Sequence, residues 1–144
     1  MYKIRPMKQE DIAQVAAIEK KCFSQPWSEQ AFADAVGKVQ YIFVVAEEAS
    51  RIIGYCGMYR VLEEGDITQV AVCEDKRRCG VARDMLGVLL RSGAEDGVEA
   101  YTLEVRVSNE AAVKLYEACG FVKESVRKEF YASPVEDAYI MWKR

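Results

Sequence analysis

The amino-acid sequence predicts an α/β fold in which a mixed sheet carries helices on both faces. Across residues 8–23 the apolar residues recur at spacings of three and four, as they do on one face of a helix. Across 99–107 they alternate with polar residues, as in a strand with one apolar face. Segments of both kinds follow one another over 144 residues, which predicts a single domain spanning 1–144.

The expected elements have the order β-α-α-β-β-β-α-β-α-β-β. Ser28 is a candidate cap for the second helix, Ser108 for the last one, and Gly120 ends that last helix. Short polar connections between the second, third and fourth strands predict antiparallel hairpins. The expected strands are 2–5, 41–46, 52–61, 66–72, 99–107, 122–131 and 136–142, and the expected helices are 8–23, 29–36, 81–94 and the segment from 109 to 119.

Composition excludes several classes of protein. There is no histidine, which removes Ser-His-Asp and Cys-His machinery and leaves acid–base chemistry to Glu, Asp, Tyr, Cys or Lys. The five cysteines contain no C-x-x-C pair, so we expect neither a disulfide framework nor a metal site. A net charge of −3 gives no general affinity for nucleic acid. Without a membrane-length apolar run or a signal-peptide core at the start, we expect a cytoplasmic protein with no membrane partner.

A basic turn at 76–83 lies between an apolar strand and an apolar helix. A glycine-bearing turn before a helix leaves backbone N–H groups unpaired at the positive end of the helix dipole, which favours an anion. Lys76, Arg77, Arg78 and Arg83 add positive charge, and Gly80 lets the backbone approach a ligand. The turn matches neither a P-loop nor a dinucleotide fingerprint. On these residues alone, a basic surface turn before a core helix is the simpler interpretation.

Two motifs carry a resemblance to a known family. The turn Arg-Arg-Cys-Gly-Val-Ala at 77–82 resembles the acyl-CoA pyrophosphate loop of the GCN5-related N-acetyltransferases, although it has Cys79 and Ala82 where the family has other residues more often. The second pattern, Asn-x-x-Ala-x-x-Leu-Tyr-x-x-x-Gly-Phe at 109–121, is similar to the second half of that family's core. Both lie in the expected order, so the chain is identified as a member of this superfamily over essentially its whole length.

A narrower resemblance is to the RimI group of the superfamily. It rests on Leu-Glu-Val-Arg-x-Ser-Asn at 103–109, on Pro-Trp-Ser-Glu at 26–29, and on Tyr131 followed by Glu-Asp-Ala at 136–138. Enzymes of that group use acetyl-CoA to acetylate the N-terminal alanine of small-subunit ribosomal protein eighteen. The resemblance therefore implies a protein N-terminus as the acceptor.

The resemblance also implies a role for particular residues. Glu104 would be the general base, Tyr116 the general acid, and Trp27 and Tyr131 would flank the peptide cleft. Residues implied in acetyl-CoA binding are Val70, Ala71, Val72, Arg77, Arg78, Cys79, Gly80, Val81, Ala82 and Asn109. In the family, the strand containing 70–72 diverges from the strand of Glu104 and opens a slot for the cofactor.

Four of these residues also have a purely structural interpretation. Glu104 could form an ion pair with Arg106, which lies two residues along on the same face of its strand. Tyr116 could be a core aromatic, Trp27 could fill the seam between two helices, and Asn109 could be a helix cap.

Two other functions remain open from the sequence. One is an acetyltransferase of the same fold that acts on a lysine side chain, a polyamine or an antibiotic amine. The other is a module that binds acyl-CoA without catalysis, against which the presence of both Glu104 and Tyr116 argues.

Overall fold

A seven-stranded mixed sheet with helices on both faces forms the framework of the protein. The computed structural model describes residues 1–144. The strand order is β1-β2-β3-β4-β5-β7-β6, and only the β4–β5 pair is parallel. The strands are β1 (Lys3–Pro6), β2 (Tyr41–Glu48), β3 (Arg51–Val61), β4 (Glu64–Val72), β5 (Ala100–Arg106), β6 (Val122–Ala132) and β7 (Val135–Lys143). The helices are α1 (Ile12–Cys22), α2 (Glu29–Ala35), α3 (Val81–Glu95) and α4 (Glu110–Ala118).

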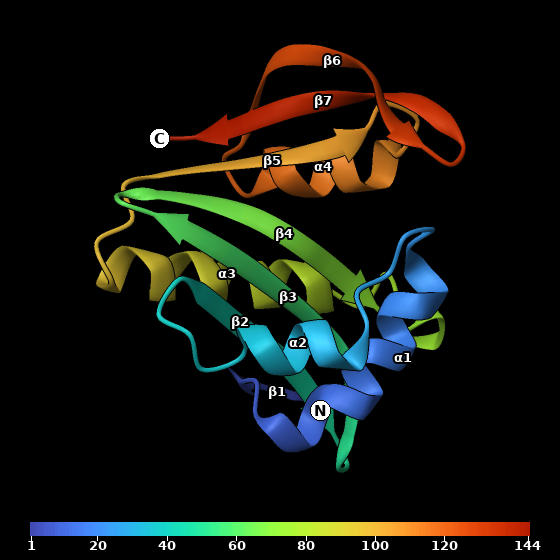
Figure 1. The fold of residues 1–144 in the computed structure, drawn as a ribbon, viewed down its shortest axis with the longest axis vertical. Coiled ribbons are helices and arrows are strands. Elements are labelled where there is room, and N and C mark those ends of the chain that lie inside the picture. Colours follow the sequence, from blue (N-terminus) through green and yellow to red (C-terminus); the bar gives the residue numbers. More distant parts are fainter.

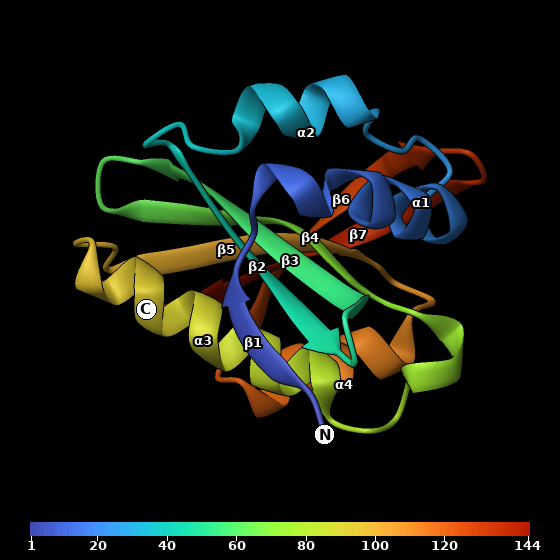
Figure 2. The same cartoon turned by 90° about the horizontal axis from the view of Figure 1, so that it is seen from below.

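Apolar residues pack on each side of the sheet. Figure 2 shows α1 and α2 on one side and α3 and α4 on the other. The α3 side buries Met85 and Leu86 against Ile53, whereas the α1 side buries Val15 and Phe32. The predicted order of elements and the placement of helices on both faces are therefore confirmed. None of the helices is long and apolar enough to cross a membrane.

The strands β4 and β5 part soon after they meet. Their pairing joins only Glu64–Asp66 to Ala100–Thr102, and Figure 1 shows the two strands diverging beyond this point. On the other side of β4, the ladder with β3 shifts register opposite Gly57 and Met58, which leaves Thr68 as an extra residue. A bulge of this kind bends a strand and redirects its side chains. Because the pairing with β5 ends at Asp66, the rest of β4 has no partner strand on that side.

The ends of two helices differ from the prediction. The segment expected to be helical from residue 8 begins as a short 3₁₀ turn at Gln9–Asp11, and α1 follows from Ile12. The predicted cap of the last helix was Ser108, but the structure places Asn109 there, with its Oδ1 accepting the Ala112 N–H at 3.2 Å. Ser108 instead donates its backbone N–H to the carboxylate of Glu136 at 2.8 Å. The helix therefore begins one residue later than predicted, because Asn109, itself a favoured cap residue, supplies the capping oxygen.

Gly57 in the central strand β3 tests how tightly the α1 side is packed. A Cβ at this position would lie 2.4 Å from Cε1 of Phe43, whose ring is held among other aromatic rings. We expect Gly57→Ala to lower the free energy of unfolding by about 1–3 kcal/mol, because the core must shift to accept a methyl group. Urea unfolding measures the change.

The matched control is Gly87→Ala in α3, where an added Cβ meets no atom within 4 Å. Alanine is the better helix former, so this variant should gain roughly 0.5–1 kcal/mol. Equal effects of the two substitutions would contradict the packing described for β3.

Candidate active site

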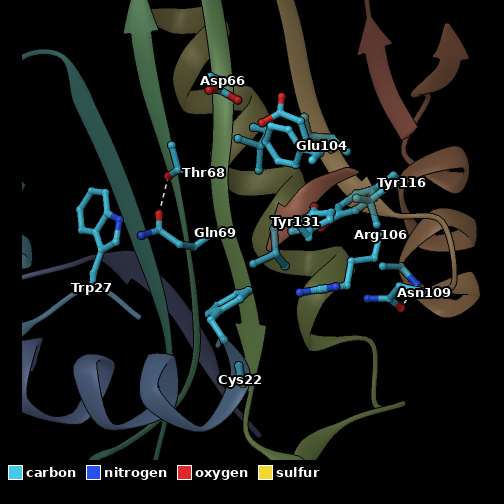
Figure 3. Close-up of a pocket in the computed structure, with 17 residues that line it drawn as sticks. Cys22, Trp27, Asp66, Thr68, Gln69, Glu104, Arg106, Asn109, Tyr116 and Tyr131 are labelled. Carbon is cyan, nitrogen blue, oxygen red and sulfur yellow. Dashed lines mark hydrogen bonds between the residues drawn. The ribbon is translucent and has the colours of Figure 1, made fainter. Parts of the chain in front are cut away.

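A cavity of about 440 Å³ occupies the space between β4 and β5. Its walls come from both strands, from the start of α4 and from the segments that carry Trp27 and Tyr131 (Figure 3). A second cavity of about 690 Å³ shares Trp27, Gln69, Arg106 and Tyr131 with the first and extends to the turn between β6 and β7. The two together make a groove that leads from the parted strands to the surface. Such a groove can hold a segment of polypeptide, which is longer than a single small molecule.

Glu104 faces the first cavity from the middle of β5. Its neighbours Leu103 and Val105 point into the core on the α3 side, so strand alternation places the carboxylate on the opposite face. Burial raises the pKa of Glu104 above its ordinary value, and the charge of Arg127 opposes this rise. A carboxylate with a raised pKa is a better proton acceptor at neutral pH.

The alternative interpretation of Glu104, an ion pair with Arg106, is wrong. Arg106 pairs with Glu136 at 3.1 Å, donates to the carbonyl oxygens of Ser133 and Pro134, and lies 4.3 Å above the ring of Tyr131. These contacts join β5 to the turn between β6 and β7. They leave Glu104 without a fixed counterion.

Tyr116 reaches the same cavity from α4. Its ring packs against Phe121 with the centroids 6.0 Å apart, and the residue is half-buried at the cavity wall. Burial raises the pKa of the phenol further above its ordinary value, so the hydroxyl keeps its proton at neutral pH. Tyr116 is therefore a packed aromatic residue that lines the cavity and carries a protonated phenol.

Two polar groups of β4 were missed by the sequence reasoning. The structure has two buried side-chain polar atoms that lack a hydrogen-bond partner, Oδ1 of Asp66 and Nε2 of Gln69, and both residues line this cavity. Burial and then the nearby charge of Glu104 raise the pKa of Asp66 to about 6. Aspartate is disfavoured in strands, so its presence within a predicted strand was the feature of the sequence that could have marked Asp66 as a site residue.

Trp27 belongs both to the seam between helices and to the cavity wall. Its ring packs against Phe32 and Tyr41 with centroids 5.2 and 5.8 Å away, and it lines both cavities. Its backbone N–H donates to the carboxylate of Glu19 at 2.9 Å, and Glu19, only 2 % exposed, also accepts the hydroxyl of Tyr55. A buried carboxylate thus fixes the loop that presents Trp27.

Tyr131 forms the opposite wall of the groove. It lies on β6, half-buried, and the guanidinium of Arg106 covers its ring. Burial, followed by the charge of Glu104, raises the pKa of Tyr131 to about 12. The structure therefore brings Trp27, Glu104, Tyr116 and Tyr131 together around one space, as expected from the sequence.

The basic turn lies away from this cavity, at the N-terminus of α3. Gly80 caps the helix with φ of +82° and offers no side chain to its N–H groups. Of the four basic residues, Lys76 pairs with Glu48 at 2.6 Å, and Arg77 donates its Nε–H to the Val72 oxygen at 3.1 Å. Arg78 and Arg83 are exposed. The loop and cap hydrogen bonds include none donated by the N–H groups of Cys79, Gly80, Val81 or Ala82.

Some of the remaining residues predicted to bind acetyl-CoA line the cavity, and others lie in the hydrophobic cores. The side chain of Val70 lines the cavity, whereas those of Ala71 and Val72 are buried in the two cores, so only their main chain could meet a ligand. Asn109 is a helix cap, and it also lines the cavity. Its Oδ1 is engaged by the cap, which leaves the amide NH₂ for a ligand.

Comparison with known proteins identifies the family. A model described as the acetyltransferase (GNAT) family matches residues 12–121. The chain therefore belongs to the acetyltransferase (GNAT) family, and it is an acyltransferase.

Particular relatives are similar over nearly the whole chain. A [ribosomal protein bS18]-alanine N-acetyltransferase of Escherichia coli (strain K12) is 32% identical, and the match covers 98% of this chain and 96% of that protein. An N-alpha-acetyltransferase of Sulfurisphaera tokodaii is 30% identical over 97% of this chain and 91% of its own. The crystal structure of the ribosomal-protein-S18-alanine N-acetyltransferase from Escherichia coli superposes with a TM-score of 0.89 at 31% identity, covering 99% of this chain and 93% of that one.

The carboxylate of Asp66 should cost stability at neutral pH. Its pKa is about 6 in the folded protein, against about 3.9 in an unfolded chain. The folded state holds the extra proton between these values, so this contribution to stability falls as pH rises from about 4 to about 6. We expect Asp66→Asn to be more stable than the wild-type protein at pH 7, by on the order of 1 kcal/mol after allowance for solvent screening.

Urea unfolding at pH 4 and pH 7 measures this difference, which should largely vanish at the lower pH. Asp34→Asn, an exposed aspartate of α2, is the matched control and should show no such pH dependence. An Asp66→Asn variant that is less stable at pH 7 would mean that the carboxylate makes a stabilising contact.

Proposed function

We propose that the protein transfers the acetyl group of acetyl-CoA to the α-amino group of an N-terminal alanine, that of ribosomal protein bS18. The observation that carries the proposal is the cavity between β4 and β5, which holds a carboxylate with a raised pKa and a protonated phenol. The relatives named for this reaction match nearly the full length of the chain, which supports the choice of acceptor.

The turn before α3 fits the pyrophosphate of acetyl-CoA. Its unpaired N–H groups, the helix dipole and the exposed Arg78 and Arg83 all favour an anion there. The unpaired side of β4 leads from this turn into the cavity, and its main-chain groups are free to bond the amide-bearing arm of the cofactor. Acetyl-CoA supplies the acetyl group as a thioester, and the NH₂ of Asn109 is placed to help hold the arm.

Glu104 and Tyr116 supply the proton transfers. Glu104 takes a proton from the substrate's ammonium group, directly or through a water molecule, and the nitrogen keeps the electron pair with which it attacks the thioester carbonyl. The C–N bond forms as the C–S bond breaks. Tyr116 gives its phenolic proton to the departing sulfur, and the second proton that the nitrogen loses on becoming an amide returns to the Tyr116 phenolate through water, so that Glu104 holds the one proton released overall. The proposed transfer is direct, from the thioester to the amine, and Cys22, the one cysteine that lines the cavity, takes no part in it.

An α-amino group suits this site better than a lysine side chain. Its reference pKa is about 7.7–8.0, against about 10.4 for lysine, so far more of it is neutral near pH 7. A glutamate with a moderately raised pKa can deprotonate it readily. The groove between Trp27 and Tyr131 gives the residues that follow the N-terminus a place to lie, which favours a peptide over a small amine.

Replacing either catalytic group should slow acetylation without weakening acetyl-CoA binding. We expect Glu104→Gln and Tyr116→Phe each to lower kcat by about a hundredfold or more, because each removes a proton transfer. The assay is mass-spectrometric initial rates on a peptide beginning with alanine. Tyr139→Phe, which alters a tyrosine of β7 outside the cavity, should leave kcat unchanged. Full activity of both Glu104→Gln and Tyr116→Phe would refute these roles.

The anion site at α3 is tested by a charge at its centre. Gly80 has φ of +82° and open space at its Cβ position, so Gly80→Glu adds a negative group and backbone strain together. We expect acetyl-CoA affinity, measured by calorimetry, to fall at least tenfold, since charge-assisted bonds of about 1.5–3 kcal/mol are opposed.

Gly97→Glu is the matched control, with the same added charge and backbone strain at a different place. Gly97 lies beyond the other end of α3 with φ of +91° and equally open space, so the substitution brings the same strain and charge away from the anion site. Its affinity for acetyl-CoA should stay as in the wild-type protein. Equal losses in the two variants would show that strain, and not the anion site, governs binding.

A further inference from the structure

Asp66 lies where β4 and β5 separate. It is the last residue of β4 that pairs with β5, opposite Thr102, and Glu104 follows two residues later on the same face of β5. Figure 3 shows the carboxylates of Asp66 and Glu104 on adjacent strands at the same end of the cavity. Two acidic side chains thus face one space from its two sides.

No group within the protein compensates the charge of Asp66. Its Oδ1 is buried and accepts no hydrogen bond, and the one charged group that perturbs it is Glu104, a like charge. A buried carboxylate oxygen without a donor is rare in proteins and costs free energy, so it calls for an explanation.

The other groups around this part of the cavity do not supply a partner. They come from each element packed against it. Arg106 pairs with Glu136 and covers the ring of Tyr131, and the charge of Arg127 opposes the rise in the pKa of Glu104. The remaining titratable groups that line the cavity are Cys22 of α1, Tyr116 of α4 and Tyr131 of β6.

A second unpartnered group points to a ligand independently. Gln69, 5 % exposed, also lines the cavity, and its Nε2 has no acceptor although its Oε1 accepts the hydroxyl of Thr68. The same wall therefore presents both a free acceptor and a free donor. A peptide with a free N-terminus could satisfy both groups. Its N-terminus carries N–H donors for the carboxylate, and its first amide carries a carbonyl acceptor for the Gln69 N–H.

We propose that Asp66 is a second acidic residue of the acceptor site, which binds the substrate's ammonium group beside Glu104 and presents it to that base. The inference rests on the proposed function and goes beyond it by assigning the residue that recognises the amine. Asp66 remains ionised while the ammonium N–H bond breaks and the proton passes to Glu104. Glu104 in turn raises the pKa of Asp66, because two neighbouring carboxylates hinder each other's ionisation.

Carbon-13 NMR of the side-chain carboxyl groups reads this interaction without turnover. Asp66 should titrate with a midpoint of about 6 in the wild-type protein, and the midpoint should fall in Glu104→Gln. Alaninamide, which carries an ammonium group, should lower the Asp66 midpoint of the wild-type protein below its value without the ligand. N-acetylalaninamide, the same molecule without that group, should not. If the Asp66 midpoint stays the same at a saturating concentration of alaninamide, the proposal is overturned.

Steady-state kinetics supply the second readout. For a peptide beginning with alanine, Asp66→Asn should raise KM about tenfold, leave the KM of acetyl-CoA unchanged, and move the acid limb of kcat/KM to lower pH. Asp34→Asn should change none of these. A merely structural aspartate would affect both KM values alike and would not move the pH limb.

The two readouts separate the inference from the proposed function. If the wild-type protein responds to alaninamide but acetylates no peptide beginning with alanine, the ammonium site stands and the acceptor is another amine. If the wild-type protein acetylates the peptide and Asp66→Asn does so with unchanged KM and pH limb, the function stands and the role of Asp66 is refuted.

Discussion

The separation of β4 from β5 after three residue pairs is the constraint on which the site depends. Two parallel strands that stayed paired would satisfy each other's backbone groups and leave no space between them. Because they part at Asp66, one edge of β4 is left with free main-chain groups, and the side chains of both strands face a cavity. On the two sides of this separation, β4 carries the bulge at Thr68, and Arg106 ties β5 to the turn between β6 and β7.

The polar groups of the site are less well satisfied than those elsewhere in the fold. The buried Glu19 receives the Trp27 N–H and the Tyr55 hydroxyl, whereas Asp66 and Gln69 each leave a buried atom unbonded. Proteins commonly sacrifice some stability where a ligand must be bound. The uncompensated charge of Asp66 that weakens the folded state is the one that we propose binds a cationic amine beside Glu104.

The sequence predicts most of this fold because its patterns are locally consistent. Periodicity places Val15 and Met85 on buried helix faces, and the family motifs bring Glu104 and Tyr116 to one cavity. It does not predict the pairing of Arg106 with Glu136, since those residues are 30 positions apart and meet only across the sheet. Nor does it show the role of Asp66, because burial and a missing partner are properties of the assembled strands. Ser108 was wrongly favoured as the cap because the next residue, Asn109, is an equally good cap type and is the one whose side chain accepts the Ala112 N–H.

The claim that most needs testing is that this cavity acetylates an α-amine. The direct measurement is tandem mass spectrometry of a peptide with the mature N-terminus of ribosomal protein bS18 and one internal lysine, after incubation with the protein and acetyl-CoA. We expect acetylation of the N-terminal alanine, with the lysine left unmodified. Acetylation of the lysine alone would contradict it, and would place this chain among the side-chain acetyltransferases of the same fold.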